Sequence, residues 1–150
     1  MISLLVAACV AIMAPAEGMT ARIVAAPDSP VRLASATVLN TGSSPLVLLY
    51  AATNTTSSPI DQFTVTVFVF EASGRLKARQ VAPGRRELGV NETKYSAMVL
   101  DVGAIDPTDT LMAGVDQVQR VGSDAWWRAD LRKIAETTAA ETLGTASPRH

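Results

Sequence analysis

Aspartates are the residues of this chain best suited to chemistry. Asp101, Asp106 and Asp109 lie in one loop, 101–109, and Asp116 follows shortly after it. Clustered carboxylates can bind calcium or act as a general acid and base. Their spacing matches no EF-hand, and aspartates also favour turns through side-chain to backbone hydrogen bonds. We therefore predict no metal, and we keep as alternatives an accessory metal- or ligand-binding protein that uses this loop and a carboxylate-dependent hydrolase.

Histidine chemistry is excluded by position. The only histidine is His150, the last residue. A Ser-His-Asp triad, a neutral-pH histidine base and a histidine metal cluster all need this residue type inside a domain. The sequence also contains no phosphate-binding glycine loop, no dinucleotide-binding fingerprint and no metalloprotease helix motif. We predict a protein that is not an enzyme and needs no cofactor.

Two groups of residues are candidates for ligand binding. Arg75, Lys77 and Arg79 alternate along a predicted strand, so they would project from one face and could contact phosphate or envelope polysaccharide. The alternative, which we favour, is a charged edge that discourages aggregation between sheets. Trp126 and Trp127 could stack on a sugar or a peptide, and the alternative is packing into the core.

The first residues predict export. Residues 1–16 carry no charged side chain, and the apolar run Leu4–Met13 leads to the small residues Ala14-Pro15-Ala16. This pattern predicts a signal peptide that is cleaved after Ala16, and a periplasmic or secreted protein. The run is shorter than the ~20 residues that span a bilayer, so a retained membrane anchor is the less favoured alternative. Cys9 follows small residues as in lipoproteins, but more apolar residues come after it, so lipid anchoring is also less favoured.

Charge and cysteine content narrow the possible partners and sources of stability. The formal net charge is −1, with 13 basic and 14 acidic residues, so no broad positive field is available to gather nucleic acid. The single cysteine lies in the predicted signal peptide. The exported protein would therefore have no disulfide, and packing alone would stabilise it.

The pattern from residue 31 onward is typical of an antiparallel β-sandwich. β-branched and aromatic runs alternate with short clusters of Gly, Pro, Ser, Asn and Asp. After a lead segment, 17–30, we predict the sandwich over 31–122. Its predicted strands are 31–40, 46–53, 63–71, 75–82, 93–100 and 111–121.

The strand 63–71 has two different faces. Phe63, Val65, Val67 and Val69 share one wholly apolar face, because side chains alternate along a strand. The other face begins with threonines and ends with Phe68 and Phe70, so we expect a chain segment or a partner to cover it. Glu71-Ala72-Ser73-Gly74 is expected to form a hairpin turn in which the glycine takes a positive φ.

Residues 123–150 are expected to form an amphipathic helix and a tail. Ser123 could cap the helix, while Trp127, Leu131 and Ile134 fall at helical spacing. We expect Trp126 or Trp127 to pack against the phenylalanine end of the sheet.

Asn54-Thr55-Thr56 and Asn91-Glu92-Thr93 match the N-glycosylation acceptor pattern. They matter only in a host that glycosylates its exported proteins. A common turn composition is the alternative explanation for both.

The hairpin motif Val67-Phe68-Val69-Phe70-Glu71-Ala72-Ser73-Gly74 resembles that of bacterial FxLYD-type immunoglobulin-like domains. Val67 stands where that family has its name-giving phenylalanine, and Phe70 and Glu71 replace its tyrosine and aspartate. The resemblance covers roughly 31–121. It implies an immunoglobulin-like antiparallel sandwich in a cell-envelope or secreted protein with no shared catalytic residues. Together with the residue patterns, it predicts a non-enzymatic module that acts through protein or glycan contacts, by exposed strand edges or the tryptophan segment.

Overall fold

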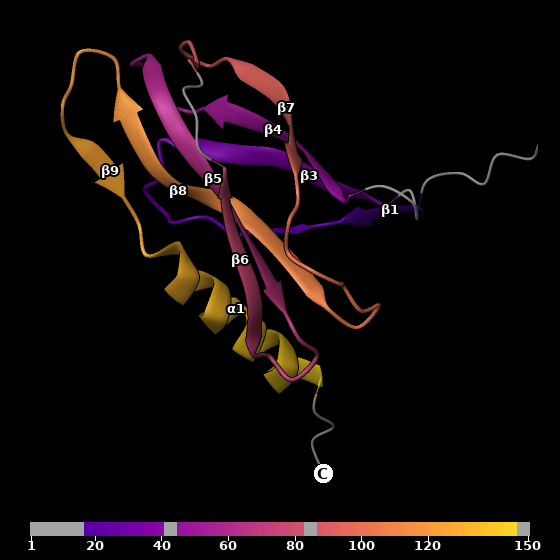
Figure 1. The fold of residues 1–150 in the computed structure, drawn as a ribbon. Coiled ribbons are helices and arrows are strands. Elements are labelled where there is room, and N and C mark those ends of the chain that lie inside the picture. The colour runs from indigo at the N-terminus through magenta and orange to yellow at the C-terminus, as the bar shows by residue number, and fades with distance from the viewer. Residues whose placement is uncertain (1–16, 41–44, 83–86, 147–150) are drawn as a thin grey trace, which may run out of the picture.

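The computed structural model describes residues 17–40, 45–82 and 87–146, and these form two β-sheets and one helix. The predicted signal peptide with Cys9, the Pro83-Gly84 turn and His150 lie outside the described residues. The expectation of a mainly β sandwich with a C-terminal helix is confirmed (Figure 1).

The described strands divide between two sheets, A and B. Sheet A is antiparallel, with β1 (Glu17–Thr20), β3 (Val31–Asn40), β4 (Val47–Asn54) and β7 (Thr93–Val99) in the order β1-β3-β4-β7. Sheet B has β2 (Arg22–Ile23), β8 (Thr110–Arg120), β5 (Ile60–Phe70) and β6 (Leu76–Ala82) in the order β2-β8-β5-β6, and β9 (Trp126–Arg128) also pairs with β8. The six predicted strands are all present with slightly shifted ends. The short strands β1, β2 and β9 were not predicted, because two to four residues carry too little periodic pattern.

The main core lies between the two sheets. The predicted apolar face of β5 is confirmed, because Phe63, Val65, Val67 and Val69 are all buried in this core. Leu48 of β4 faces them from sheet A. Gly74 has a φ of 85°, as predicted for the hairpin that joins β5 to β6.

A second core lies on the outer face of sheet B, under α1 (Leu131–Ala146). Figure 1 shows the helix running along this face of the sheet. Phe68 and Phe70 are each 1% exposed there, and they pack with Leu131, Ala135 and Ala139 of the helix. The expectation that a chain segment covers these phenylalanines is confirmed. No helix in the described ranges is long and apolar enough to cross a membrane.

The expected helix start at Ser123 and the expected tryptophan packing are wrong. Residues 123–130 form a turn and β9, because Gly122 adopts a φ of 75° and the following residues pair antiparallel with β8. The Ser123 hydroxyl accepts a hydrogen bond from the amide of Ala125 and so closes this turn. Asp130 caps the helix instead, since its Oδ1 accepts the Lys133 amide at 3.1 Å.

At Gly114 of β8, the segment that follows β2 and the first residue of α1 both lie close to sheet B. A Cβ at this position would lie 2.2 Å from the backbone oxygen of Val24 and 2.9 Å from Cδ2 of Leu131. Glycine therefore allows the N-terminal segment and the start of the helix to approach the sheet closely.

We predict that Gly114→Ala lowers the free energy of unfolding by about 3 kcal/mol, since the backbone oxygen of Val24 cannot rotate away from the new methyl group. Urea unfolding measures the loss. Gly89→Ala is the matched control, because there the methyl group meets only the flexible Glu92 carboxylate, at 2.9 Å. Equal losses in the two variants would contradict the role given to Gly114.

Candidate functional site

The predicted basic ladder of β6 is interrupted by a β-bulge. Ala78 pairs with Val69 and Leu76 pairs with Phe70, so Lys77 is an extra residue between them. The bulge breaks the two-residue alternation that a ladder on one face requires.

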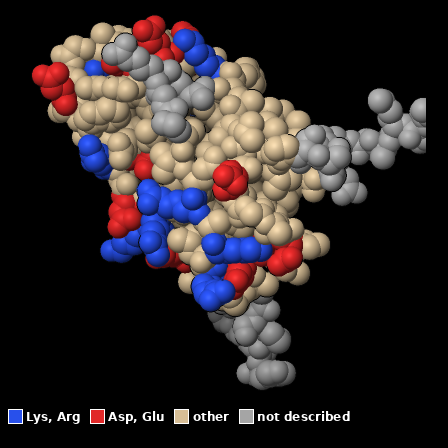
Figure 2. Space-filling view, viewed as in Figure 1, with Lys and Arg blue, Asp and Glu red and all other residues tan. Residues whose placement is uncertain are grey.

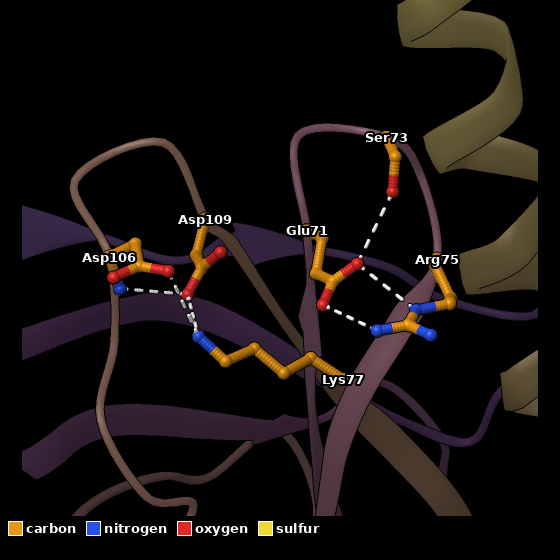
Figure 3. Close-up of polar contacts among 6 residues, drawn as sticks. All are labelled: Glu71, Ser73, Arg75, Lys77, Asp106 and Asp109. Carbon is orange, nitrogen blue, oxygen red and sulfur yellow. Dashed lines mark hydrogen bonds and ion pairs between the residues drawn. The ribbon is translucent and has the colours of Figure 1, made fainter.

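Each cation of the ladder already has a carboxylate partner. The shortest nitrogen to oxygen distances are 2.9 Å for Arg75 and Glu71, 2.7 Å for Lys77 and Asp109, and 4.0 Å for Arg79 and Asp116. Figure 3 shows the first two pairs as separate clusters, one within the hairpin turn and one joining β6 to the aspartate loop. A phosphate or an acidic glycan would have to compete with these carboxylates for the same nitrogens.

Only two of the three aspartates of the loop 101–109 converge, because Asp106 and Asp109 both contact Lys77 Nζ, at 3.4 and 2.7 Å. Asp109 has a side chain only 2% exposed, and its Oδ2 accepts hydrogen bonds from Lys77 Nζ and, at 2.8 Å, from the Asp106 amide. The Asp106 side chain is 71% exposed, and the exposed Asp101 gives its amide to Gln80. Within the described ranges, no three His, Cys, Asp or Glu residues are placed to hold a metal ion. The buried carboxylate of this loop fastens it to β6.

Hydrogen bonding between Lys77 and Asp109 shifts both groups away from their ordinary pKa values. The lysine lowers the pKa of Asp109, and the Asp106 amide adds to that effect. The same bond to Asp109 raises the pKa of Lys77. Both groups are thus held in their charged forms.

Asp116 is separate from the loop and has a structural role. It is the extra residue of a bulge in β8, since Thr64 pairs with Gln117 and Val65 pairs with Val115. Its carboxylate is buried and hydrogen-bonded to the Thr64 hydroxyl.

The tryptophans lie in β9, and neither forms an open platform. Both are partly buried. Trp127 packs against the main core, and its indole Nε1 donates to Asp28 Oδ2 at 3.1 Å. This geometry favours the packing alternative for Trp127.

One predicted glycosylation acceptor is buried. Asn54 is 0% exposed, and its Nδ2 donates to the backbone oxygens of Ser58, at 2.8 Å, and of Gly89, at 3.1 Å. The fold therefore uses the atom that a glycan would occupy. Asn91 is exposed, in a turn with a φ of 56°.

No segment within the described ranges covers the outer face of sheet A, which we call the open face. Cross-strand pairing aligns its side chains in rows, because residues opposite each other share a face. The rows are Leu39, Val47 and Val99; Thr20, Thr37, Leu49 and Ala97; and Ser35, Ala51 and Tyr95. An end row of Arg32, Thr53 and Thr93 completes the described face. Arg32 is the charged residue of these rows, and its Nη2 donates to the Pro27 backbone oxygen at 2.7 Å.

The exposed aromatic of the open face is Tyr95, which is 83% exposed on the edge strand β7. Val99 is 60% exposed and Leu49 is 40% exposed on the same face. A shallow groove of about 500 Å³ runs over the middle of the face and is lined in part by Ser35 and Thr37. In Figure 2 most of the basic side chains in view gather over β6 and α1.

Sequence patterns did not reveal the open face. Tyr95, Ala97 and Val99 alternate with Lys94, Ser96 and Met98, so both faces of β7 carry apolar residues and the pattern does not say which is buried. The signal that could have found it is in β4. VLLYAATN is apolar on both faces, as in a strand covered on both sides.

The free edge of β7 is obstructed at both ends. At one end Lys94 Nζ donates to the Glu87 backbone oxygen. At the other, Gln80 Nε2 of β6 donates to the Val99 backbone oxygen at 2.8 Å. Charged residues and side-chain bridges at an edge discourage the addition of a partner strand. The face of sheet A is therefore a better candidate for contacts than its β7 edge.

Comparison with known proteins identifies no relative. No protein-family model, no curated protein and no solved structure matches the chain. The resemblance to FxLYD-type domains thus stays a prediction.

We predict that the Lys77–Asp109 pair makes stability depend on acid pH. Because the folded-state pKa of Asp109 lies below its ordinary value of 3.8, the pair stabilises the fold above that value and the stabilisation is lost as the pH falls through the lowered pKa. Because the pKa of Lys77 is raised, the stabilisation that its charge provides is lost only in alkali, as the pH rises above the ordinary value of 10.5 and through the raised pKa. Urea unfolding at a series of pH values should show a steeper acid fall in the wild type than in Lys77→Met.

Lys133→Met, which removes an exposed lysine of α1, is the control and should keep the wild-type slope. The prediction is wrong if Lys77→Met shows the same acid dependence as the wild type.

Proposed function

We propose that this chain is an exported, non-enzymatic binding or structural module of the cell envelope, and that the open face makes its contacts with a partner. One observation carries the proposal. The outer face of sheet B is covered by the chain's own helix, whereas no described segment covers the outer face of sheet A, which is uncharged apart from Arg32 in its end row and has Tyr95 at 83% exposure. An antiparallel sheet that faces water normally alternates apolar residues inside with polar ones outside. Continuous apolar patches on a surface are typical of interaction sites.

A protein partner fits the open face better than a glycan. Leu39, Val47, Leu49 and Val99 present branched apolar side chains, which favour packing against other apolar side chains. A glycan remains the second candidate, because Tyr95 could stack on a sugar ring beside the hydroxyls of Ser35 and Thr37.

The alternatives based on carboxylates have less support. A metal site or a hydrolase needs carboxylates free to reach a ligand or a substrate. Asp109 is engaged with Lys77, and Asp116 is engaged with Thr64. Asp106 and Asp109 converge on the Lys77 ammonium group, at 3.4 and 2.7 Å, and no third carboxylate joins them among the described residues.

One further observation agrees with the proposed exported module. β3 and β4 pair in sheet A and β5 and β6 pair in sheet B, so the chain alternates between two sheets, an arrangement compatible with the immunoglobulin-like sandwich that the FxLYD resemblance implies.

A photo-crosslinking amino acid in place of Tyr95, introduced in the producing host, tests this proposal. We expect a covalent adduct with a protein, and we expect Leu49→Lys in the same chain to abolish it by placing a charge on the apolar face. The same crosslinker at Val121, a 56% exposed apolar residue outside sheet A, is the control. Circular dichroism and thermal melting establish that the variants are folded.

An adduct with a glycan would show that the partner of the open face is a glycan, the second candidate, and not a protein. If position 95 gives no adduct beyond the control, the open face is not a contact surface and the proposal fails.

A further inference from the structure

We propose that the open face packs against the open face of a second copy of this chain, so that the protein is a face-to-face dimer. This inference rests on the proposed function, because it names the partner of the same surface. In such a dimer the two A sheets would form the middle layers, and each α1 would lie on the outside over its own sheet B.

The charge distribution favours a second copy as the occupant. The charged residue of the open face is Arg32, which lies in its end row and donates to the Pro27 backbone oxygen, so the central rows of two identical faces meet without like-charge repulsion. The whole chain has a formal net charge of only −1, so long-range repulsion between two copies is also small. A strongly charged partner would gain nothing from this face and would have to desolvate its own charges.

The shape of the open face suits sheet-on-sheet packing. Small side chains at Ser35, Ala51 and Ala97 lie beside larger ones at Leu49 and Tyr95. Sheets that pack face to face interdigitate large and small side chains across a layer about 10 Å thick. A two-fold axis brings the same patch from both copies together, so each large residue can meet a small one of the partner.

Dimerisation through the face also agrees with the obstructed β7 edge. Strand addition would need free backbone groups along β7, and Lys94 and Gln80 limit access at its two ends. Face-to-face packing needs only side chains, and those of Leu49, Tyr95 and Val99 are exposed.

Sedimentation velocity of the purified full chain, from about 1 to 200 µM, tests the dimer over the range in which weak and moderate self-association is resolved. We expect a monomer–dimer equilibrium in the wild type. Leu49→Lys should weaken it by about 100-fold or more, since a two-fold axis sets two lysines in one apolar interface. Val81→Lys is the matched control, because Val81 is 39% exposed against 40% for Leu49 and lies on β6 of sheet B.

The control should dimerise as the wild type does. The apolar run in residues 1–16 is identical in all three chains, so association through it would not distinguish Leu49→Lys from the others.

The dimer is ruled out by a wild type that stays monomeric over the whole range, by species larger than a dimer, or by variants that weaken association equally or not at all. A monomer that still crosslinks another protein through position 95 would overturn the dimer and leave the proposed function standing. A monomer with no adduct at position 95 would overturn both.

Discussion

The burial of β5 on both faces is the constraint from which the rest of the architecture follows. Its valines and Phe63 close the core against sheet A, while Phe68 and Phe70 point the other way. Water on either face would expose large apolar side chains, so sheet B needs a layer on each side. Sheet A provides one layer and α1 provides the other. The described segments cover only one face of sheet A, and this asymmetry leaves its outer face open in that part of the chain.

The charged side chains of the bulges form ion pairs and hydrogen bonds with nearby segments of the same chain. The bulge at Lys77 turns its ammonium group toward Asp109, and the bulge at Asp116 holds its carboxylate beside Thr64. Residues that look like a basic ladder and an acidic loop in the sequence are thus partners of each other. Pairs of this kind hold loops against strands, and they leave little charge available for a ligand.

Much of the fold could be predicted from the sequence, because long strands carry a two-residue period that short ones lack. The two faces of β5 were predicted correctly, and so was the need to cover Phe68 and Phe70. The C-terminal segment was partly misjudged, because Trp127, Leu131 and Ile134 fit a helical period while Trp126–Arg128 in fact pairs with β8. Pairing between strands distant in the sequence overrides a local period. The open face escaped prediction since β4 and β7 are apolar on both sides, and only the tertiary structure decides which side is buried.

Gly114 has a consequence for how the chain reaches this structure. The helix covers the phenylalanine face of sheet B, and the bare backbone at Gly114 lets Val24 and Leu131 approach that face closely. A missing methyl group thus sets how near this outer layer can settle. Because the layer is C-terminal, it can be completed only after the strands that it covers have been synthesised.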